Sequence, residues 1–285
     1  MNALNHVVTA VFDVLLWPLE KLGPAYALVI ASGLFGVLAL IAFKYISRQQ
    51  AIARVKNKIK AHLIEIRIYA DDPRLVSRAI GKTLMRNVQY LTLNLLPFVP
   101  LSIPFTFVVA QCVVRYAFAP VPLHASATGL LAGQGTTLNV ALSREFADQI
   151  KGLTIHFPDG LRAVSPLVRN TSEGRAWQEF IALTAGVHTI EFSLADGTRA
   201  GKLLAAGAVT PRQMQPVRGR GFWSALLWPA EDAFEAPSPF AQIEFVYPDA
   251  DLGWLPSGAG GVLLVFVLSS MLFGLLALKP FKIQI

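Results

Sequence analysis

The chain has 285 residues, of which 54% are hydrophobic and only 15% are charged, and its formal net charge is +7. Soluble globular proteins average about 25% charged residues, so this composition excludes a disordered or coiled-coil protein and argues against an ordinary soluble enzyme. The single cysteine, Cys112, excludes an internal disulfide and any cysteine-based zinc site. These features together indicate a membrane protein.

The first segment, residues 1–24, contains an amphipathic helix that we predict over residues 3–17. Two locations for it stay open. It lies in the outer membrane interface, because it is too short to span and ends at a tryptophan, or it packs on the outer domain. Its apolar residues recur at spacings of three and four: they are Leu4, Val7, Val8, Val11, Phe12 and Leu15, with Asn5, Thr9 and Asp13 on the other side.

Residues 25–46 form the first predicted transmembrane helix, since crossing the hydrocarbon core takes about 20 apolar residues. Residues 47–88 predict a basic helical hairpin, whose second arm begins with an aspartate N-cap followed by proline at Asp72-Pro73. The alternative is a pair of solvated arms that merely link two spans. The predicted seam between the arms follows a coiled-coil spacing and consists of Ile52, Val55, Ile59, Leu63 and Ile66, paired with Val76, Ile80, Leu84 and Val88.

Residues 89–115 form the second predicted transmembrane helix, which contains Pro97, Pro100 and Pro104. Proline has no N–H to donate within a helix, so it leaves an earlier carbonyl without its regular partner. At membrane depth, only protein, water or a passing substrate can satisfy such a carbonyl.

Residues 120–210 are predicted to form an extracytoplasmic β-sandwich of the immunoglobulin type, because short apolar runs alternate with turn residues. In the clearest run, Ile190, Phe192 and Leu194 share one face of a strand. The predicted strands cover Thr137–Leu142, Leu153–Phe157, Leu161–Val168, Trp177–Leu183, Val187–Leu194 and Lys202–Val209.

Residues 211–256 are predicted to combine an interfacial amphipathic segment with a final strand at Ala241–Tyr247. The third predicted transmembrane helix follows at residues 257–278, and residues 279–285 form a tail. Tryptophan is enriched at membrane interfaces, so the aromatic stripe in residues 219–235 is more typical of an anchor than of a ligand site. The predicted interface anchors are Trp17, Trp223, Trp228 and Trp254.

The distribution of basic residues predicts the orientation of the spans. Residues 44–86 contain eleven basic and three acidic residues, a net charge of +8, whereas residues 1–25 carry a net charge of −1. By the positive-inside rule, the hairpin and the C-terminus are cytoplasmic, and the N-terminus and the large domain are extracytoplasmic. We therefore expect a multi-pass protein of the inner (cytoplasmic) membrane. Because topology accounts for the charge, no specific nucleic acid is expected as a partner, although a weak contact of the basic loop with anionic lipid or ribosomal RNA stays open.

The sequence contains no catalytic signature such as GxSxG, a Walker loop or HExxH. The five histidines lie far apart, and His188 shares its strand face with Ile190 and Phe192, which is typical of a histidine at the edge of a core. We therefore expect no metal, no cofactor and no enzymatic activity.

Polar side chains inside the predicted spans are better candidates for function, because burying them in lipid costs free energy. For any single residue we favour hydrogen bonding between helices, with Lys44 extending its amine toward water. Together, however, they would let the second span face a partly hydrated groove. The groove candidates are Asn94, Ser102, Thr106 and Gln111, with Lys44 at the inner end of the first span.

The order of parts in the first 115 residues resembles the YidC/Oxa superfamily of membrane-protein insertases, and in particular its small archaeal-type and endoplasmic-reticulum members. The resemblance rests on the amphipathic helix at residues 4–17, the basic hairpin, the proline-bearing run from Leu95 to Phe105, and Phe43-Lys44-Tyr45-Ile46 before the hairpin. Unlike the bacterial members, this chain has no arginine in its first span. It also inserts a large outer domain between the second and third spans.

This resemblance implies a protein that assists the insertion or folding of other membrane proteins, with the groove receiving a polar segment of the substrate. The implied partners are membrane lipid, nascent membrane proteins or the ribosome, and a protein partner or a second copy, since three helices hardly enclose a path alone. The alternative is a membrane-anchored scaffold whose outer domain recognises an envelope component. The hairpin residues expected to contact the ribosome or the incoming chain are Arg48, Arg54, Lys56, Lys58, Lys60 and Arg67.

Overall fold

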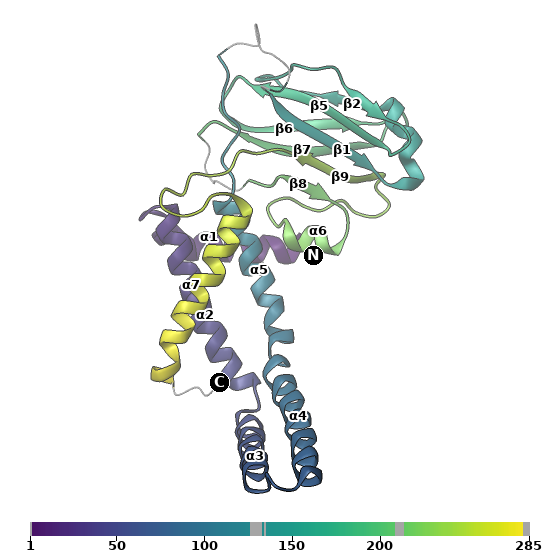
Figure 1. Ribbon diagram of the computed structural model, residues 1–285. Helices are drawn as coiled ribbons and strands as arrows, with labels where there is room; N and C mark the ends of the chain where they lie inside the picture. Colours follow the sequence, from purple (N-terminus) through teal and green to yellow (C-terminus); the bar gives the residue numbers. More distant parts are fainter. Residues whose placement is uncertain (1, 126–132, 134, 209–213, 282–285) are drawn as a thin grey trace. The chain divides into compact units, whose positions relative to one another are not determined.

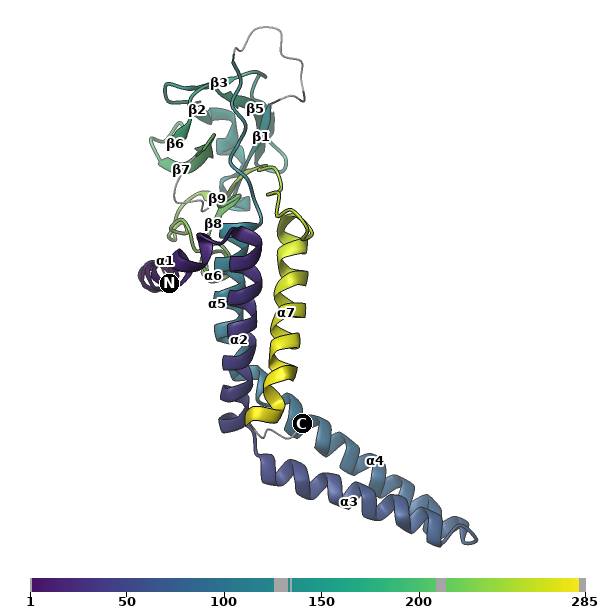
Figure 2. The same cartoon turned by 90° about the vertical axis from the view of Figure 1, so that its left-hand side faces the viewer.

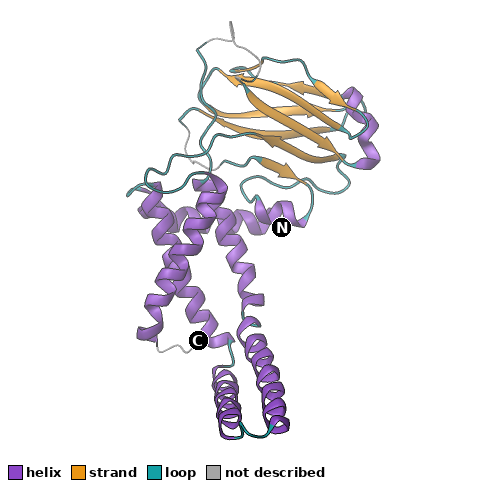
Figure 3. Cartoon of the chain, viewed as in Figure 1, coloured by secondary structure: helices purple, strands orange, loops and turns teal. Residues whose placement is uncertain are grey.

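The computed structural model describes residues 2–125, 133, 135–208 and 214–281. Over these residues it contains seven α-helices and a separate antiparallel β-domain (Figure 1, Figure 3). The chain divides into two compact units. The β-unit combines the chain up to Val29 with Thr106–Phe266, and the helical unit combines Ile30–Phe105 with the residues from Val267 onward. Val209 of a predicted strand and Lys282 of the predicted tail lie outside the described residues.

Three stretches of the described chain are long and apolar enough to cross a membrane, at the positions that the sequence predicts. They are α2 (Pro24–Ile46), the stretch Pro73–Tyr116 and α7 (Gly258–Phe281). The second of these is interrupted, because α4 (Pro73–Leu95) ends before Pro97 and α5 (Phe98–Tyr116) begins after it. The expectation of one continuous helix over residues 89–115 is therefore wrong at Leu96 and Pro97.

Proline chemistry explains this interruption. Pro97 and Pro100 lie four and seven residues after Leu93 and neither can donate an N–H, so two successive turns lose a regular hydrogen bond. The remaining bonds across the break are long, with 3.3 Å from the Val99 nitrogen to the Leu96 oxygen and 3.4 Å from the Leu101 nitrogen to the Pro97 oxygen.

Within the helical unit, α2 and α7 approach closely at glycine positions. A Cβ added at Gly36 would collide with the backbone of Ser270, and one added at Gly33 would lie 2.7 Å from the Phe273 ring. Small residues at such contacts allow the backbones of apolar helices to come close enough for extensive dispersion contact. Glycine at these positions therefore sets the distance between the two helices.

The predicted hairpin is present as α3 (Gln49–Ile68) and α4, which lie side by side in both views (Figure 1, Figure 2). As expected, α4 begins at an aspartate cap: one carboxylate oxygen of Asp72 accepts hydrogen bonds from the backbone nitrogens of Arg74 at 2.9 Å and Leu75 at 3.2 Å. These bonds satisfy two of the N–H groups that a helix start leaves unpaired.

The predicted seam of the hairpin is correct for the start of α3 and wrong for α4. Ile52 and Val55 are buried, but Ile80, Leu84 and Val88 are all more than half exposed. The face of α4 that meets α3 instead contains Ala79, which is fully buried. An alanine lets two helices pack closely, so the larger apolar residues of α4 rotate away from the partner arm.

The β-domain confirms the predicted β-rich region and contains two antiparallel sheets. The predicted strand Leu161–Val168 is two strands, β3 (Leu161–Ala163) and β4 (Val168–Asn170), which both pair with β5 (Arg175–Ala182). Pro166 lies between them and has no N–H for a sheet ladder. One sheet has the order β3-β5-β1-β9-β8, with β4 also on β5, where β1 is Thr136–Leu142, β8 is Val217–Gly219 and β9 is Phe240–Phe245.

The second sheet has the order β2-β6-β7, formed by β2 (Thr154–His156), β6 (Gly186–Ser193) and β7 (Arg199–Ala206). One hydrophobic cluster contains residues of both sheets. Phe180 of the first sheet and Phe192 of the second are fully buried in it, and the Phe180 ring lies 5.7 Å from that of Phe245. Burial of large aromatic side chains supplies much of the free energy that holds such a core together.

Candidate functional site

A cavity of about 710 Å³ lies among the apolar helices of the helical unit. Its walls come from α2, the end of α4, the start of α5, and α7. Aromatic pairs hold α2 against the α4–α5 segment, with 5.7 Å between the ring centres of Phe43 and Phe98 and 6.1 Å between those of Phe35 and Phe105. Gly36 and Gly274, from the close contact of α2 with α7, line another part of the cavity. Small residues therefore leave this space open.

Two of the predicted groove residues, Asn94 and Ser102, line this cavity together. They come from opposite sides of the helix break, since Asn94 lies in the last turn of α4 and Ser102 in the first turns of α5. The Asn94 amide nitrogen donates to the Tyr90 carbonyl at 2.8 Å, and the Ser102 hydroxyl donates to the Val99 carbonyl at 2.7 Å. The break in the helix thus brings these two polar side chains to one cavity.

The side-chain oxygen of Asn94 is the most unusual group beside this cavity. It is buried, and no described residue donates a hydrogen bond to it. A buried amide oxygen without a donor costs about 1–3 kcal/mol, and the cost rises in a hydrocarbon environment, where water cannot replace the donor. The oxygen is closed off from the cavity itself, so an incoming N–H or O–H group reaches it only after the neighbouring side chains move.

Gln111 does not line the cavity and belongs to the β-unit. Its side chain is 1% exposed and donates to the Thr9 hydroxyl at 2.7 Å. Its amide oxygen accepts a bond from Arg115 at 3.3 Å. Thr106, a further groove candidate, is also absent from the cavity lining. Of the four candidates in the second span, the structure brings together only Asn94 and Ser102.

Lys44 lies at the end of α2 and is exposed, with its amine donating to the backbone oxygen of Phe281 at 2.9 Å. It does not line the cavity. Because Phe43 contacts Phe98, Lys44 marks the level at which α2, the α4–α5 break and the end of α7 meet.

Sequence reasoning missed Arg115, which organises the polar contacts between α5 and α1 (Asn2–Glu20). The Arg115 guanidinium is 5% exposed and lies 2.6 Å from the Asp13 carboxylate, and it also donates to the Thr9 carbonyl at 3.4 Å. Next to it, the Tyr116 hydroxyl donates to Glu20 at 3.2 Å. The sequence contained a signal for this contact. One arginine stands at the end of the apolar second span, and one aspartate stands on the polar face of the N-terminal helix, so the two opposite charges could be paired.

The N-terminal helix α1 packs through a face that carries its polar residues and the buried Leu16, and most of its other large apolar residues are exposed. Asn5 is buried and donates to the carbonyl of Ala225 in α6 (Phe222–Leu227). Thr9 and Asp13, one and two turns further on, contact α5. The exposed residues on the other face are Leu4, Val7, Val11, Val14 and Leu15. A helix in water would bury that face. The packing of α1 on the β-unit agrees with one of the two predicted locations, and its place in a membrane interface stays a prediction.

Three of the four predicted tryptophan anchors are largely exposed, namely Trp17, Trp223 and Trp254. The Lys21 amine lies 3.5 Å from the centre of the Trp17 ring, a cation–π contact. Trp228 is partly buried, with its ring 6.3 Å from that of Phe118. Exposed rings at the ends of apolar helices are typical of a membrane interface.

The basic residues predicted on the first arm of the hairpin are all exposed, and they are Arg48, Arg54, Lys56, Lys58, Lys60 and Arg67. One ion pair crosses the hairpin, with 3.8 Å between the Lys82 amine and the Glu65 carboxylate. A hydrogen bond from His62, together with the Lys82 charge, lowers the pKa of Glu65. The hairpin thus presents an excess of positive charge to its surroundings.

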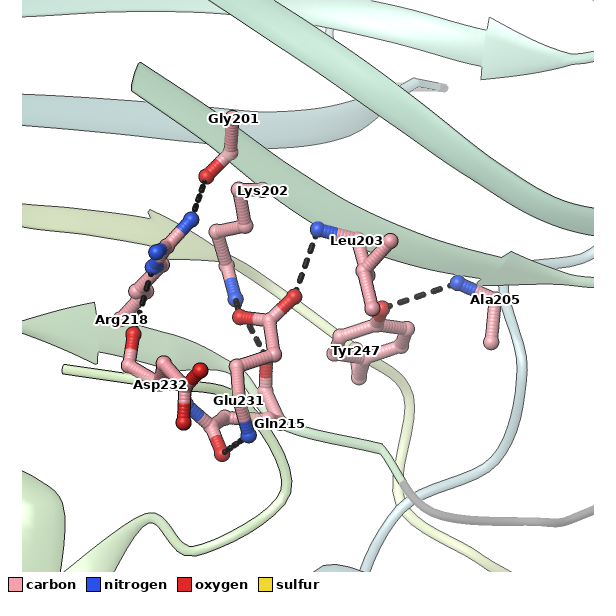
Figure 4. A network of polar contacts seen from close by, with 9 residues as sticks. All are labelled: Gly201, Lys202, Leu203, Ala205, Gln215, Arg218, Glu231, Asp232 and Tyr247. Atoms are coloured by element: carbon pink, nitrogen blue, oxygen red, sulfur yellow. Dashed lines mark hydrogen bonds and ion pairs between the residues drawn. The ribbon is translucent and has the colours of Figure 1, made fainter. Parts of the chain in front are cut away.

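The β-domain contains a buried polar network around Lys202 (Figure 4). The Lys202 amine is 0% exposed and donates to Glu231 at 2.9 Å and to the Gln215 carbonyl at 2.7 Å. Glu231 also accepts from the Leu203 nitrogen, and its own nitrogen donates to the Gln215 side chain at 2.8 Å. Burial lowers the pKa of Lys202, and the Glu231 carboxylate opposes this effect. The Lys202 amine and the Glu231 carboxylate are paired with each other and with neighbouring groups, so this network fastens β7 to the 228–235 segment.

No group of three or more His, Cys, Asp or Glu side chains in the described chain could hold a metal ion. Comparison with protein families, curated proteins and solved structures gives no match to this chain. The cavity and its polar groups therefore carry the functional reasoning.

Proposed function

We propose that this protein crosses the membrane three times and assists the insertion or folding of other membrane proteins, as its resemblance to the YidC/Oxa superfamily implies. In this proposal the hairpin is cytoplasmic, and the N-terminus and the β-domain, a β-sandwich, lie outside. The charge distribution supports this orientation, since eleven of the basic residues fall in residues 44–86.

The observation that carries the proposal is the buried, unpartnered side-chain oxygen of Asn94, a residue that lines a cavity between apolar helices. Moving a polar group from water into hydrocarbon without a hydrogen bond costs about 2–7 kcal/mol. An acceptor that becomes accessible beside this cavity, at the inner end of the spans, would reduce this cost for a segment entering the bilayer. Ser102 and the carbonyls freed by the prolines add further polar groups on the same α4–α5 segment.

The arrangement of α1 supports the proposed outer interface. Its polar residues contact α5 and α6, whereas Leu4, Val7, Val11, Val14 and Leu15 are largely uncovered by the described residues. Because α1 leads directly into α2 at Pro24, these residues lie at the membrane end of the first span. Lipid is the environment that satisfies them.

Three helices do not enclose a path, so we infer that a partner protein or a second copy completes the groove. An incoming segment would then be bounded by α2, the α4–α5 segment, α7 and this additional surface. The exposed basic residues of the hairpin suit contact with a ribosome or a nascent chain.

Site-specific photo-crosslinking in cells tests the proposal. A photoreactive residue is placed at Asn94 or Ser102, with Leu276 as the control because it is 67% exposed on α7 and does not line the cavity. We expect diverse nascent membrane proteins at the two cavity positions and few at the control. Crosslinks only to neighbouring helices would overturn the insertase proposal.

A second variant separates function from stability. Asn94→Leu combined with Ser102→Ala removes both cavity polar groups, and we expect impaired biogenesis of membrane substrates with unchanged protein levels. Gln111→Leu is unsuitable for this purpose, because Gln111 supports the docking of α1.

The alternative function is a membrane-anchored scaffold whose β-domain recognises an envelope partner. The extent of the β-domain favours it, since two sheets and a common core make up the largest folded part of the chain. In the crosslinking experiment, one recurring partner in place of diverse substrates would support the scaffold.

A further inference from the structure

The arm α4 carries an apolar stripe that nothing in the described chain covers. Its members are spaced by four, four, three and four residues, so they share one narrow face of the helix. Each side chain is between 53% and 66% exposed. The stripe consists of Ile80, Leu84, Val88, Leu91 and Leu95.

This stripe is separate from the seam of the hairpin. The face of α4 toward α3 contains the buried Ala79, and Lys82 on the same side pairs with Glu65 of α3. From Ile80 to Leu95 the stripe extends about 22 Å at the helical rise of 1.5 Å per residue. An uncovered apolar surface of this length in a folded protein indicates an interaction site.

The stripe residues Ile80, Leu84 and Val88 lie outside the predicted second span, residues 89–115. The 19 residues of α5 extend about 28 Å, which nearly matches a hydrocarbon core of about 30 Å. The contact of Phe98 with Phe43 places the start of α5 level with the charged end of α2, where Lys44 is exposed. The stripe residues Ile80, Leu84 and Val88 therefore lie beyond this boundary, where an apolar face would meet water, whereas Asn94 in the last turn of α4 lies at the boundary.

Charge distinguishes between the possible occupants of the stripe. The arm α4 carries four basic residues and no acidic residue, namely Arg74, Arg78, Lys82 and Arg86. A second copy would bring a hairpin of net charge +7 against another of the same charge. An anionic lipid surface, in contrast, attracts each nearby basic side chain by about 1 kcal/mol.

The stripe is also continuous with surface that faces lipid in the proposed orientation. Beyond Leu95, the residues Leu96, Phe98 and Val99 are all more than half exposed. No polar residue interrupts this run on the exposed face, so lipid contact at α5 extends directly onto α4. The break at Pro97 separates the two helices, so α4 does not have to continue along the direction of α5.

We propose that α4 docks lengthwise on the anionic cytoplasmic surface of the membrane, with Ile80, Leu84 and Val88 inserted among the lipids. The inference rests on the proposed spans and orientation and is independent of insertase activity. An acidic helix of a partner protein is the competing occupant, and the following experiment decides between the two.

The test uses the full chain, with Cys112→Ala, reconstituted as one copy per nanodisc in phosphatidylcholine with or without phosphatidylglycerol. A single cysteine at Ile80→Cys, Leu84→Cys or Gln89→Cys carries an environment-sensitive fluorophore. Gln89 is the matched control, because it is exposed on the opposite side of α4 and is closer along the chain to the span than Leu84. Nitroxide lipids quench a label that lies among acyl chains, and aqueous iodide quenches one that lies in water.

We expect nitroxide lipid to quench the labels at positions 80 and 84 several-fold more than the label at 89, with the difference shrinking when phosphatidylglycerol is omitted. A helix standing upright would give the reverse order, since position 89 is closer to the membrane. That order, or strong iodide quenching at positions 80 and 84, would overturn the proposal and leave the stripe open to a protein partner. The nanodiscs are also treated with protease. If α2 or α7 is cleaved, that helix does not span the bilayer, and the proposed topology is refuted.

Discussion

Replacing Lys202 by methionine isolates the contribution of the buried network in the β-domain. The lysine amine is 0% exposed and its partner Glu231 is 6% exposed, so neither charge is solvated by water. Methionine keeps a similar volume and therefore avoids most of the cavity penalty. The substitution leaves the Glu231 carboxylate buried without its counter-charge, which typically costs about 3–5 kcal/mol.

For a domain of this size, a loss of about 3–5 kcal/mol corresponds to a fall in Tm of about 10–20 °C. The assay is urea-dependent pulse proteolysis of the full chain in detergent, following the fragment that contains the β-domain. Lys151→Met is the matched control, since its ion pair with Asp148 is 3.8 Å long and both side chains are largely exposed. That control should change stability by no more than about 0.5 kcal/mol.

A double variant tests the stated cause of this loss. Lys202→Met combined with Glu231→Gln removes both charges but keeps a side-chain oxygen for the Leu203 nitrogen. We expect it to recover most of the lost stability, because no uncompensated charge remains. If Lys202→Met were as stable as the Lys151→Met control, or if the double variant were no better than the single one, the reasoning about buried charge would be refuted.

Three further predictions concern packing, docking and pH. Gly36→Ala should separate α2 from α7 and lower Tm in detergent by several degrees, whereas Gly81→Ala, with open space around it, should raise stability by up to about 1 kcal/mol. Arg115→Leu should remove the ion pair with Asp13 and the bond to the Thr9 carbonyl and speed amide exchange throughout α1, measured by mass spectrometry. Unchanged exchange would contradict the proposed docking. The pKa of Asp196 is lowered by the hydrogen bond that it accepts from a backbone N–H in its turn. Its contribution to stability is therefore present above the unfolded-state pKa and lost as pH falls through the lower folded-state value, so Asp196→Ala should flatten the acid loss of protection in that turn.

The sequence predicted the type and order of most elements because each depends on local chemistry. Apolar length located the three candidate spans, and the aspartate and proline at positions 72 and 73 located the start of α4. Alternation located the strands, and proline explains where one predicted strand divides into β3 and β4. The short strand β8 was missed, since three residues carry too little pattern to be recognised.

The candidate site was predictable only in part, because the sequence of one helix does not show which neighbouring element its polar residues contact. Asn94 and Gln111 look alike in sequence, yet Asn94 lines a cavity while Gln111 bonds to Thr9 about a hundred residues earlier. The partner of Gln111 depends on how α1 returns onto α5. That arrangement is a tertiary property, and no periodicity within either helix encodes it.

Two helices also show why amphipathic pattern alone cannot assign a protein-facing side. In α1 polar residues and Leu16 meet protein, while five large apolar residues are exposed. In α4 a small residue, Ala79, meets the partner arm while Leu84 points away from it. In water each arrangement would leave at least three large apolar side chains solvated, each worth about 1.5–3 kcal/mol when buried. The chain connects α1 to the outer end of the first span and α4 to the inner end of the second in the proposed orientation. A bilayer reaching both faces accounts for both arrangements with one physical cause, and it predicts that detergent removal without lipid will aggregate the protein through these two faces.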